Sequence, residues 1–142
     1  NNAHTHPFVS VYEAYKKSGP NVLGVEALQG DDGCTGVKVN TADGYADYLF
    51  SATDMQAHHP SKRVSFCGGL GLIREKEGQI QLMYLGCGRS LKKGNFVLES
   101  DHDVYAAIYM QHGVWYYSAT GPVRVKIGKE TKELNEGYNQ KL

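Results

Sequence analysis

Residues 79–86 read QIQLMYLG, residues 114–119 read VWYYSA and residues 123–127 read VRVKI. Each stretch is short and rich in aliphatic or aromatic side chains, as strands are, and VRVKI alternates them with cations at the two-residue period of a β-strand. Similar stretches lie further out along the chain, at residues 8–15 (FVSVYEAY) and 45–51 (YADYLFS). Glycine-bearing turns separate them, and no stretch has the longer amphipathic period of a convincing helix. The pattern therefore predicts a chain built from β-strands.

Turn signals divide the chain into about eleven short strands at intervals of roughly 8–12 residues, a spacing typical of a sandwich or barrel. We predict an all-β fold, namely an antiparallel β-sandwich of about eleven short strands. The expected sandwich domain covers residues 8–134. A polar lead-in (residues 1–7) precedes it, and a polar tail (residues 135–142) follows it.

Two glycine-rich runs interrupt the expected strands, GGLG at residues 68–71 and GCG at residues 86–88. Neither precedes a helix, so neither resembles the phosphate-binding loop that opens a helix N-terminus. Glycine within a strand more often marks a bulge or a bend. We therefore interpret both runs as bulges or kinks.

The alternation also suggests which side chains fill the core, although a shift of one residue turns every side chain of a strand to the other face. The sequence does not settle which face is inward for every element. The expected inward-facing residues are Phe8 or Val9, Val11, Leu49, Leu72, Leu82, Tyr84, Ile108 and Val125.

Composition excludes several classes of function. The chain has 142 residues, fifteen basic and fifteen acidic, so its formal net charge is zero. We expect one domain without an electrostatic footprint for nucleic acid. No apolar stretch approaches the roughly 20 residues that span a bilayer, so we expect no membrane partner.

The three cysteines are Cys34, Cys67 and Cys87. Their spacing matches no zinc motif, and an odd number leaves at least one thiol unpaired. We expect free thiols; one disulfide and a catalytic thiol are the alternatives.

Several motifs occur together in the first two thirds of the chain. They are HPFVSVYEAY at residues 6–15, VKV at residues 37–39, ADGYADYLFS at residues 42–51, Phe66, and GLIRE at residues 71–75 followed by Gly78. This set resembles the C-terminal β-domain of heparinase II/III-like polysaccharide lyases and related multidomain enzymes. The resemblance covers roughly residues 6 to 100, and Ala14 stands where proline is common.

The resemblance implies an accessory role. In such enzymes an α/α toroid carries most of the catalytic machinery, and 142 residues of β-pattern have no room for it. No catalytic residue of that family maps onto this chain, so we assign no catalytic residue and no cofactor. We expect a non-catalytic module whose partners are the other domains of a larger parent chain and an acidic polysaccharide. The parent would act in the periplasm or outside the cell, and the start at Asn1 without a methionine suggests a processed product or an excised fragment.

A stand-alone carbohydrate-binding module is the first alternative. Trp115 and Tyr117 share one face of an expected strand and could stack on successive sugar rings. Arg89 and Lys92, near a turn, could meet a uronic acid or a sulfated sugar. Against this, the lone tryptophan of a sandwich usually lies in the core, and turn cations usually face solvent.

A small metal-dependent enzyme is the second alternative. Its candidate ligands are His58, His59 and His102, because imidazole is a common zinc ligand and a zinc site needs three or four donors. The sequence shows no sign that these donors converge. Paired histidines in a polar loop are usually only solvated.

Overall fold

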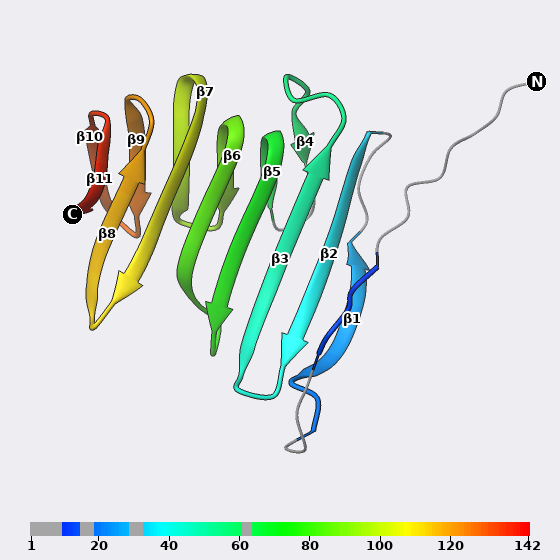
Figure 1. Cartoon of the computed structure of the whole chain (residues 1–142). Helices are drawn as coiled ribbons and strands as arrows, with labels where there is room; N and C mark the ends of the chain where they lie inside the picture. The colour runs from blue at the N-terminus through cyan, green and yellow to red at the C-terminus, as the bar shows by residue number, and fades with distance from the viewer. Residues whose placement is uncertain (1–9, 15–18, 29–32, 61–63) are drawn as a thin grey trace, which may run out of the picture.

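The computed structural model describes residues 10–14, 19–28, 33–60 and 64–142. This part of the chain contains eleven β-strands and no helix, so no helical segment in it could cross a membrane (Figure 1). The strands are β1 (Val22–Leu28), β2 (Cys34–Thr41), β3 (Tyr45–Ala52), β4 (His59–Pro60), β5 (Ser65–Lys76), β6 (Gln79–Lys93), β7 (Phe96–Gln111), β8 (Val114–Ala119), β9 (Val123–Ile127), β10 (Glu130–Leu134) and β11 (Gly137–Lys141). The predicted all-β class is confirmed.

Every strand pair is antiparallel, and the main path of the sheet runs β1-β2-β3-β5-β6-β7-β8-β11. The central strands are long, with 12, 15 and 16 residues in β5, β6 and β7. Each half of β7 pairs with a different neighbour: residues 96–99 pair with β9, and residues 106–111 pair with β8. The sheet therefore folds over on itself. A long layer (β1, β2, β3, β8, β11) faces a short layer (β4, β9, β10), and β5, β6 and β7 run through both, as Figure 1 shows.

Glycines form the bend between the two layers. The register of the β5–β6 pair shifts between Cys67 and Gly68, and that of the β6–β7 pair shifts on both sides of Gly88. A β-carbon on Gly88 would lie 2.6 Å from both the Cys67 carbonyl oxygen and the Gly68 α-carbon. Only glycine lets two backbones approach this closely. The interpretation of the two glycine-rich runs as bulges is confirmed, although each expected pair of short strands is one bent strand.

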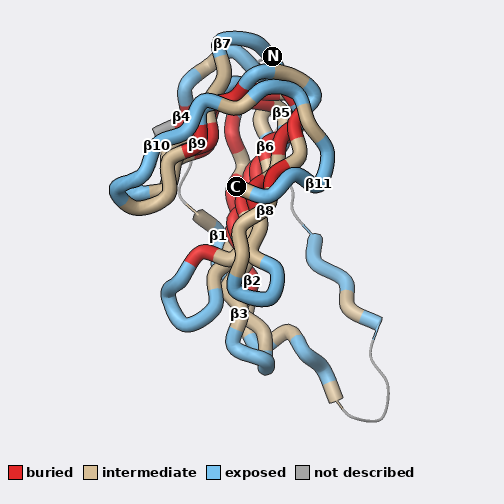
Figure 2. Tube along the Cα trace, turned by 90° about the vertical axis from the view of Figure 1, so that its left-hand side faces the viewer, coloured by how far each residue is buried: buried red, intermediate tan, exposed pale blue. Residues whose placement is uncertain are grey.

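The core lies between the layers, where Figure 2 shows most of the buried residues. Its most deeply buried side chains come from β5, β6 and β7 and are Phe66, Ile73, Met83, Leu85, Leu91, Leu98 and Ile108. The core prediction is confirmed for Ile108 and for Val125, which is 2% exposed.

The rest of the core prediction has the wrong parity or lies outside the described residues. Leu72, Leu82 and Tyr84 are only half-buried, because their neighbours Ile73, Met83 and Leu85 point inward. Leu49 and Val11 are exposed, at 36% and 41%. Residues 79–86 carry apolar side chains on both parities, so alternation alone does not show which side faces the core. Phe8 and Val9 lie outside the described residues.

The two ends of the chain differ from the expected strand pattern. Residues 10–14, which belong to the first expected strand, are not in a strand; the rest of that stretch lies outside the described residues. Conversely, β11 forms within residues 135–142, the expected polar tail, by pairing with β8. Backbone groups make this pairing, so it needs no apolar side chains. Cys67 and Cys87 are free thiols, as expected.

Candidate functional site

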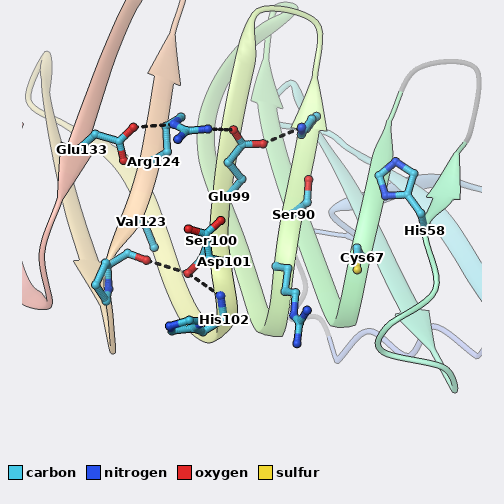
Figure 3. A pocket seen from close by; sticks show the side chains of 13 residues that line it. His58, Cys67, Ser90, Glu99, Ser100, Asp101, His102, Val123, Arg124 and Glu133 are labelled. Carbon is cyan, nitrogen blue, oxygen red and sulfur yellow. Dashed lines mark hydrogen bonds and ion pairs between the residues drawn. The ribbon is translucent and has the colours of Figure 1, made fainter.

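The outer face of the short layer carries a row of polar side chains. By register, Cys67 on β5 lies beside Ser90 on β6, which is followed by Glu99, Arg124 and Glu133 on β7, β9 and β10. This row lines a hollow of about 490 Å³ (Figure 3). We call it the charged hollow. The bends of β5, β6 and β7 place it, because each contributes its short-layer half to this face.

An ion-pair network crosses the charged hollow. Lys92 Nζ lies 2.6 Å from Glu99 Oε2, and Arg124 Nη1 lies 3.0 Å from Glu99 Oε1. Arg124 Nε also donates to Glu133 Oε1 at 2.5 Å. The hydrogen bond from Lys92, together with Arg124, lowers the pKa of the Glu99 carboxyl. The carboxylates of Glu133 and Glu99 in turn raise the pKa of the Arg124 guanidinium.

Side chains at the edge of the charged hollow also have hydrogen-bond partners. Arg89 Nε donates to Asp103 Oδ1 at 3.0 Å, and Ser65 Oγ is hydrogen-bonded to His58 Nε2 at 2.7 Å. Each cation lining the hollow, Arg89, Lys92 or Arg124, therefore already faces a carboxylate. An anionic sugar bound here would have to displace that partner. The hollow is better suited to hydrogen bonding than to binding a strong anion.

The structure brings four of the predicted site residues to this hollow and separates the others from it. Arg89, Lys92, His58 and His102 all line it. His59 does not; it is 6% exposed and its Nε2 lies 3.3 Å from the Asp54 carbonyl oxygen. Over the described ranges, no group of three or more His, Cys, Asp or Glu side chains is placed to hold a metal ion. His58, His59 and His102, the ligands of the metal-dependent alternative, form no such group there.

Trp115 and Tyr117, the predicted sugar-stacking pair, share the inward face of β8. Their partners on β7 are Met110 and Ile108. Tyr117 is 9% exposed, and Trp115 is half-buried with its ring 5.9 Å from the ring of Phe96. Trp115 also lines a pocket of about 260 Å³ beside Val125 and Ile127. These side chains contribute mainly to packing.

A second surface, which the sequence analysis missed, lies on the outer face of the long layer. Tyr84 on β6, Tyr105 on β7 and Tyr138 on β11 line a groove of about 590 Å³. We call it the tyrosine groove. Tyr105 and Tyr138 are 55% and 77% exposed. Alternation within residues 104–110 could have indicated Tyr105, but Tyr138 lies in residues 135–142, the expected polar tail.

The fold and its surfaces define a class: an antiparallel β-sandwich module with two open, ligand-sized surfaces on opposite outer faces. The comparison with known proteins places this module in a family. The family model for the C-terminal domain of endo-acting ulvan lyases matches residues 22–110, from β1 to nearly the end of β7. The chain belongs to this family of endo-acting ulvan lyase C-terminal domains.

One relative supports this assignment. The chain is 33% identical over 101 residues to an endo-acting ulvan lyase from Formosa agariphila. The matched region covers 67% of this chain but only 12% of that protein. No solved structure matches the chain significantly. The expected polysaccharide-lyase C-terminal domain is confirmed, and the family that matches is defined by ulvan lyases.

Proposed function

We propose that this chain acts as an accessory, non-catalytic C-terminal module of a polysaccharide lyase. The observation that carries the proposal is the family match over residues 22–110, since the matching family is a C-terminal domain of lyases. The ulvan lyase relative supports it, because the matched region is a small part of a much longer protein. The module would support the lyase rather than perform the reaction.

An apolar patch on the long layer is the candidate contact with the rest of the parent protein. Leu49 on β3 and Leu70 on β5 are 36% and 46% exposed. Leu72 is half-buried beside both, as the register partner of Leu49 and two residues along β5 from Leu70. Exposed apolar groups gathered on one face commonly mark an interaction surface. We propose that the parent's remaining domains cover this leucine patch, because the relative has most of its length outside the matched region.

Three narrower parts of the proposal rest on the sequence alone. The heparinase II/III-like assignment stays a prediction, since the matching family is named for ulvan lyases. An acidic polysaccharide as substrate and a periplasmic or extracellular location of the parent are likewise proposals. They fit together, because a polysaccharide chain is too large to enter a cell uncleaved.

The accessory role is tested by comparing the isolated chain with its full-length parent. Lyase cleavage beside a uronic acid leaves an unsaturated sugar that absorbs ultraviolet light, so product formation can be followed directly. We expect product from the parent and none from the isolated chain. Cleavage by the isolated chain would contradict the proposal.

The docking role is tested in the full-length parent with Leu70→Asp, and with Leu23→Asp as the matched control. Leu23 is also exposed, at 70%, but lies in the edge strand β1. We expect Leu70→Asp to split thermal unfolding into separate domain transitions and Leu23→Asp to leave it unchanged. Identical unfolding of the two variants would show that the leucine patch is not the contact.

A further inference from the structure

We propose that the tyrosine groove binds a glycan chain by stacking uncharged sugar faces on the exposed rings of Tyr105 and Tyr138, with Tyr84 as a wall of the groove. The proposal depends on the proposed function only for polysaccharide as the class of ligand. It assigns a site to residues other than the Trp115–Tyr117 pair and the cations of the charged hollow.

The geometry of the groove is that of an open platform with walls. Tyr84 is the register partner of Ala107 on β7, so Tyr105 lies one strand over and two residues away on the same face. Tyr138 comes from the opposite side, from β11 across β8. Small side chains lie between the rings, because Ala107, Ser118 and Gly137 also line the groove. Its volume of about 590 Å³ lies within the usual range of ligand sites.

Most other tyrosines in the described residues have an aromatic ring or a cation against them, whereas the three tyrosines of the groove do not. Tyr109 and Tyr116 stack on each other with ring centroids 5.9 Å apart. Tyr45 lies under Arg74 and Lys76, at 5.1 Å and 4.9 Å. In the described residues, by contrast, no ring or cation lies against Tyr84, Tyr105 or Tyr138. Tyr105 and Tyr138 are also largely exposed, so their rings are available to a ligand. Tyr84 is half-buried: a β-carbon on Gly86 would lie 3.1 Å from its ring, so Tyr84 forms a wall of the groove.

The chemistry of the groove suits a sugar. The C–H groups on one face of a pyranose ring pack on an aromatic ring, and its hydroxyls need hydrogen-bond partners beside that ring. Tyrosine hydroxyls, Ser118, Thr120 and the Glu136 carboxylate provide such partners. A purely apolar partner would leave these groups unpaired.

Charge decides which kind of sugar contact is favoured. Glu136 is the one charged side chain lining the groove within the described structure, and no cation lines it. A carboxylate accepts hydrogen bonds from sugar hydroxyls but repels a uronate or sulfate. The groove therefore fits uncharged units or uncharged faces of the glycan, whereas the charged hollow would require ion pairing.

The experiment is affinity electrophoresis of the 142-residue chain in native gels. The gels contain ulvan or a panel of neutral polysaccharides, each run at low and at raised salt. Stacking survives added salt, whereas binding through surface cations is screened. We expect ulvan or a neutral polysaccharide to retard the wild-type chain, and the retardation to persist at raised salt.

Matched variants assign the site. Tyr105→Ala and Tyr138→Ala should each weaken binding about tenfold, the change that 1.4 kcal/mol produces. Tyr12→Ala, a change at a 91% exposed tyrosine outside the groove, and Arg89→Gln, a change in the charged hollow, should leave binding unchanged. Unchanged melting temperatures show that the variants fold.

Three outcomes overturn the proposal: no retardation by any of these polysaccharides, retardation that salt abolishes, or full retardation of Tyr105→Ala and Tyr138→Ala. A fourth is binding by the isolated chain that disappears in the full-length parent, since another domain would then cover the groove. The binding test uses mainly the isolated chain and measures binding, not cleavage. Its failure would therefore not contradict the accessory role in the parent. Failure of the leucine-patch test would in turn leave the groove intact.

Discussion

The backbones of Gly68 and Gly88 lie against each other where β5 and β6 bend from one layer into the other. A β-carbon on Gly68 would stand 2.8 Å from the Gly88 α-carbon, and one on Gly88 would stand 2.6 Å from the Gly68 α-carbon. Any side chain at either position would push the two strands apart. This contact lets the sheet fold over, so the core and both outer surfaces depend on it.

The first prediction concerns this contact. Gly88→Ala should lower the free energy of unfolding by about 3 kcal/mol, because the added methyl group meets backbone atoms that cannot rotate away. Chemical denaturation measures the change. Gly24→Ala is the control, since a β-carbon there meets nothing within 4 Å. Equal stability of the two variants would refute the close approach.

The second prediction tests which face of β5 is inward. Ile73 is fully buried, whereas its neighbour Leu72 is half-buried on the outer face. Ile73→Ala should cost about 2–5 kcal/mol through lost burial and the cavity it leaves. Leu72→Ala should cost roughly 1 kcal/mol, as expected for a partly exposed side chain. Thermal and urea unfolding measure the two changes in the free energy of unfolding. A larger loss for Leu72→Ala than for Ile73→Ala would mean that Leu72, not Ile73, faces the core.

The third prediction concerns a shielded ion pair. Lys93 Nζ lies 2.8 Å from Glu75 Oε1, and the two side chains are 12% and 13% exposed. The same ammonium lies 3.3 Å from the centre of the Tyr48 ring. Lys93→Met should lower the free energy of unfolding by about 2–3 kcal/mol, because it leaves the shielded Glu75 carboxylate without its cation.

The control for the ion pair is Arg89→Met. Arg89 also pairs with a carboxylate, but its side chain is 45% exposed, so the loss should stay below about 1 kcal/mol. The double variant Lys93→Met with Glu75→Met should recover part of the stability, since no unpaired charge remains. A double variant less stable than Lys93→Met alone would argue against this account.

The fourth prediction concerns pH. The hydrogen bond from Lys92 lowers the pKa of Glu99 in the folded protein below its usual value of 4.5. As the pH falls, Glu99 therefore becomes protonated in the unfolded chain before it does in the folded protein. The stabilisation is present above the usual value and is lost as the pH falls through the lower, folded-state value.

Glu99→Gln tests the effect, because glutamine keeps the shape and removes the charge. The variant should be less stable than wild type by about 0.5–1 kcal/mol at neutral pH, the range of partly exposed ion pairs. The difference should shrink as the pH falls below 4.5, the usual value for this carboxyl. Urea unfolding across the acid range measures it. A difference independent of pH would mean that packing, not charge, explains the effect.

Much of the fold could be predicted from particular residues. The apolar run at residues 79–86 lies in an observed strand, and the turn glycines Gly44, Gly78 and Gly113, all with positive φ, lie in observed hairpins. The GGLG and GCG runs were correctly interpreted as bulges. The parity of β5 and β6 was not predictable, because both faces of these strands carry apolar side chains and only the second layer shows which is covered.

The candidate surfaces were predicted less well, for the same physical reason. Tryptophan is well suited to stacking on sugars, but Trp115 lies on the face of β8 that the pairing with β7 turns toward the core. The groove instead joins Tyr84, Tyr105 and Tyr138, which are far apart in the sequence. Their common face depends on β11, a polar strand whose backbone hydrogen bonds leave little trace in side-chain pattern.

The amino-acid order alone determined that this protein is made of antiparallel strands that bend at glycines, because side-chain period and backbone freedom are local properties. Tertiary structure alone decided which apolar face became core, which cations found carboxylate partners and which tyrosines stayed open. Those outcomes depend on which strands become neighbours after the sheet folds over, and residues distant in the chain set that arrangement together.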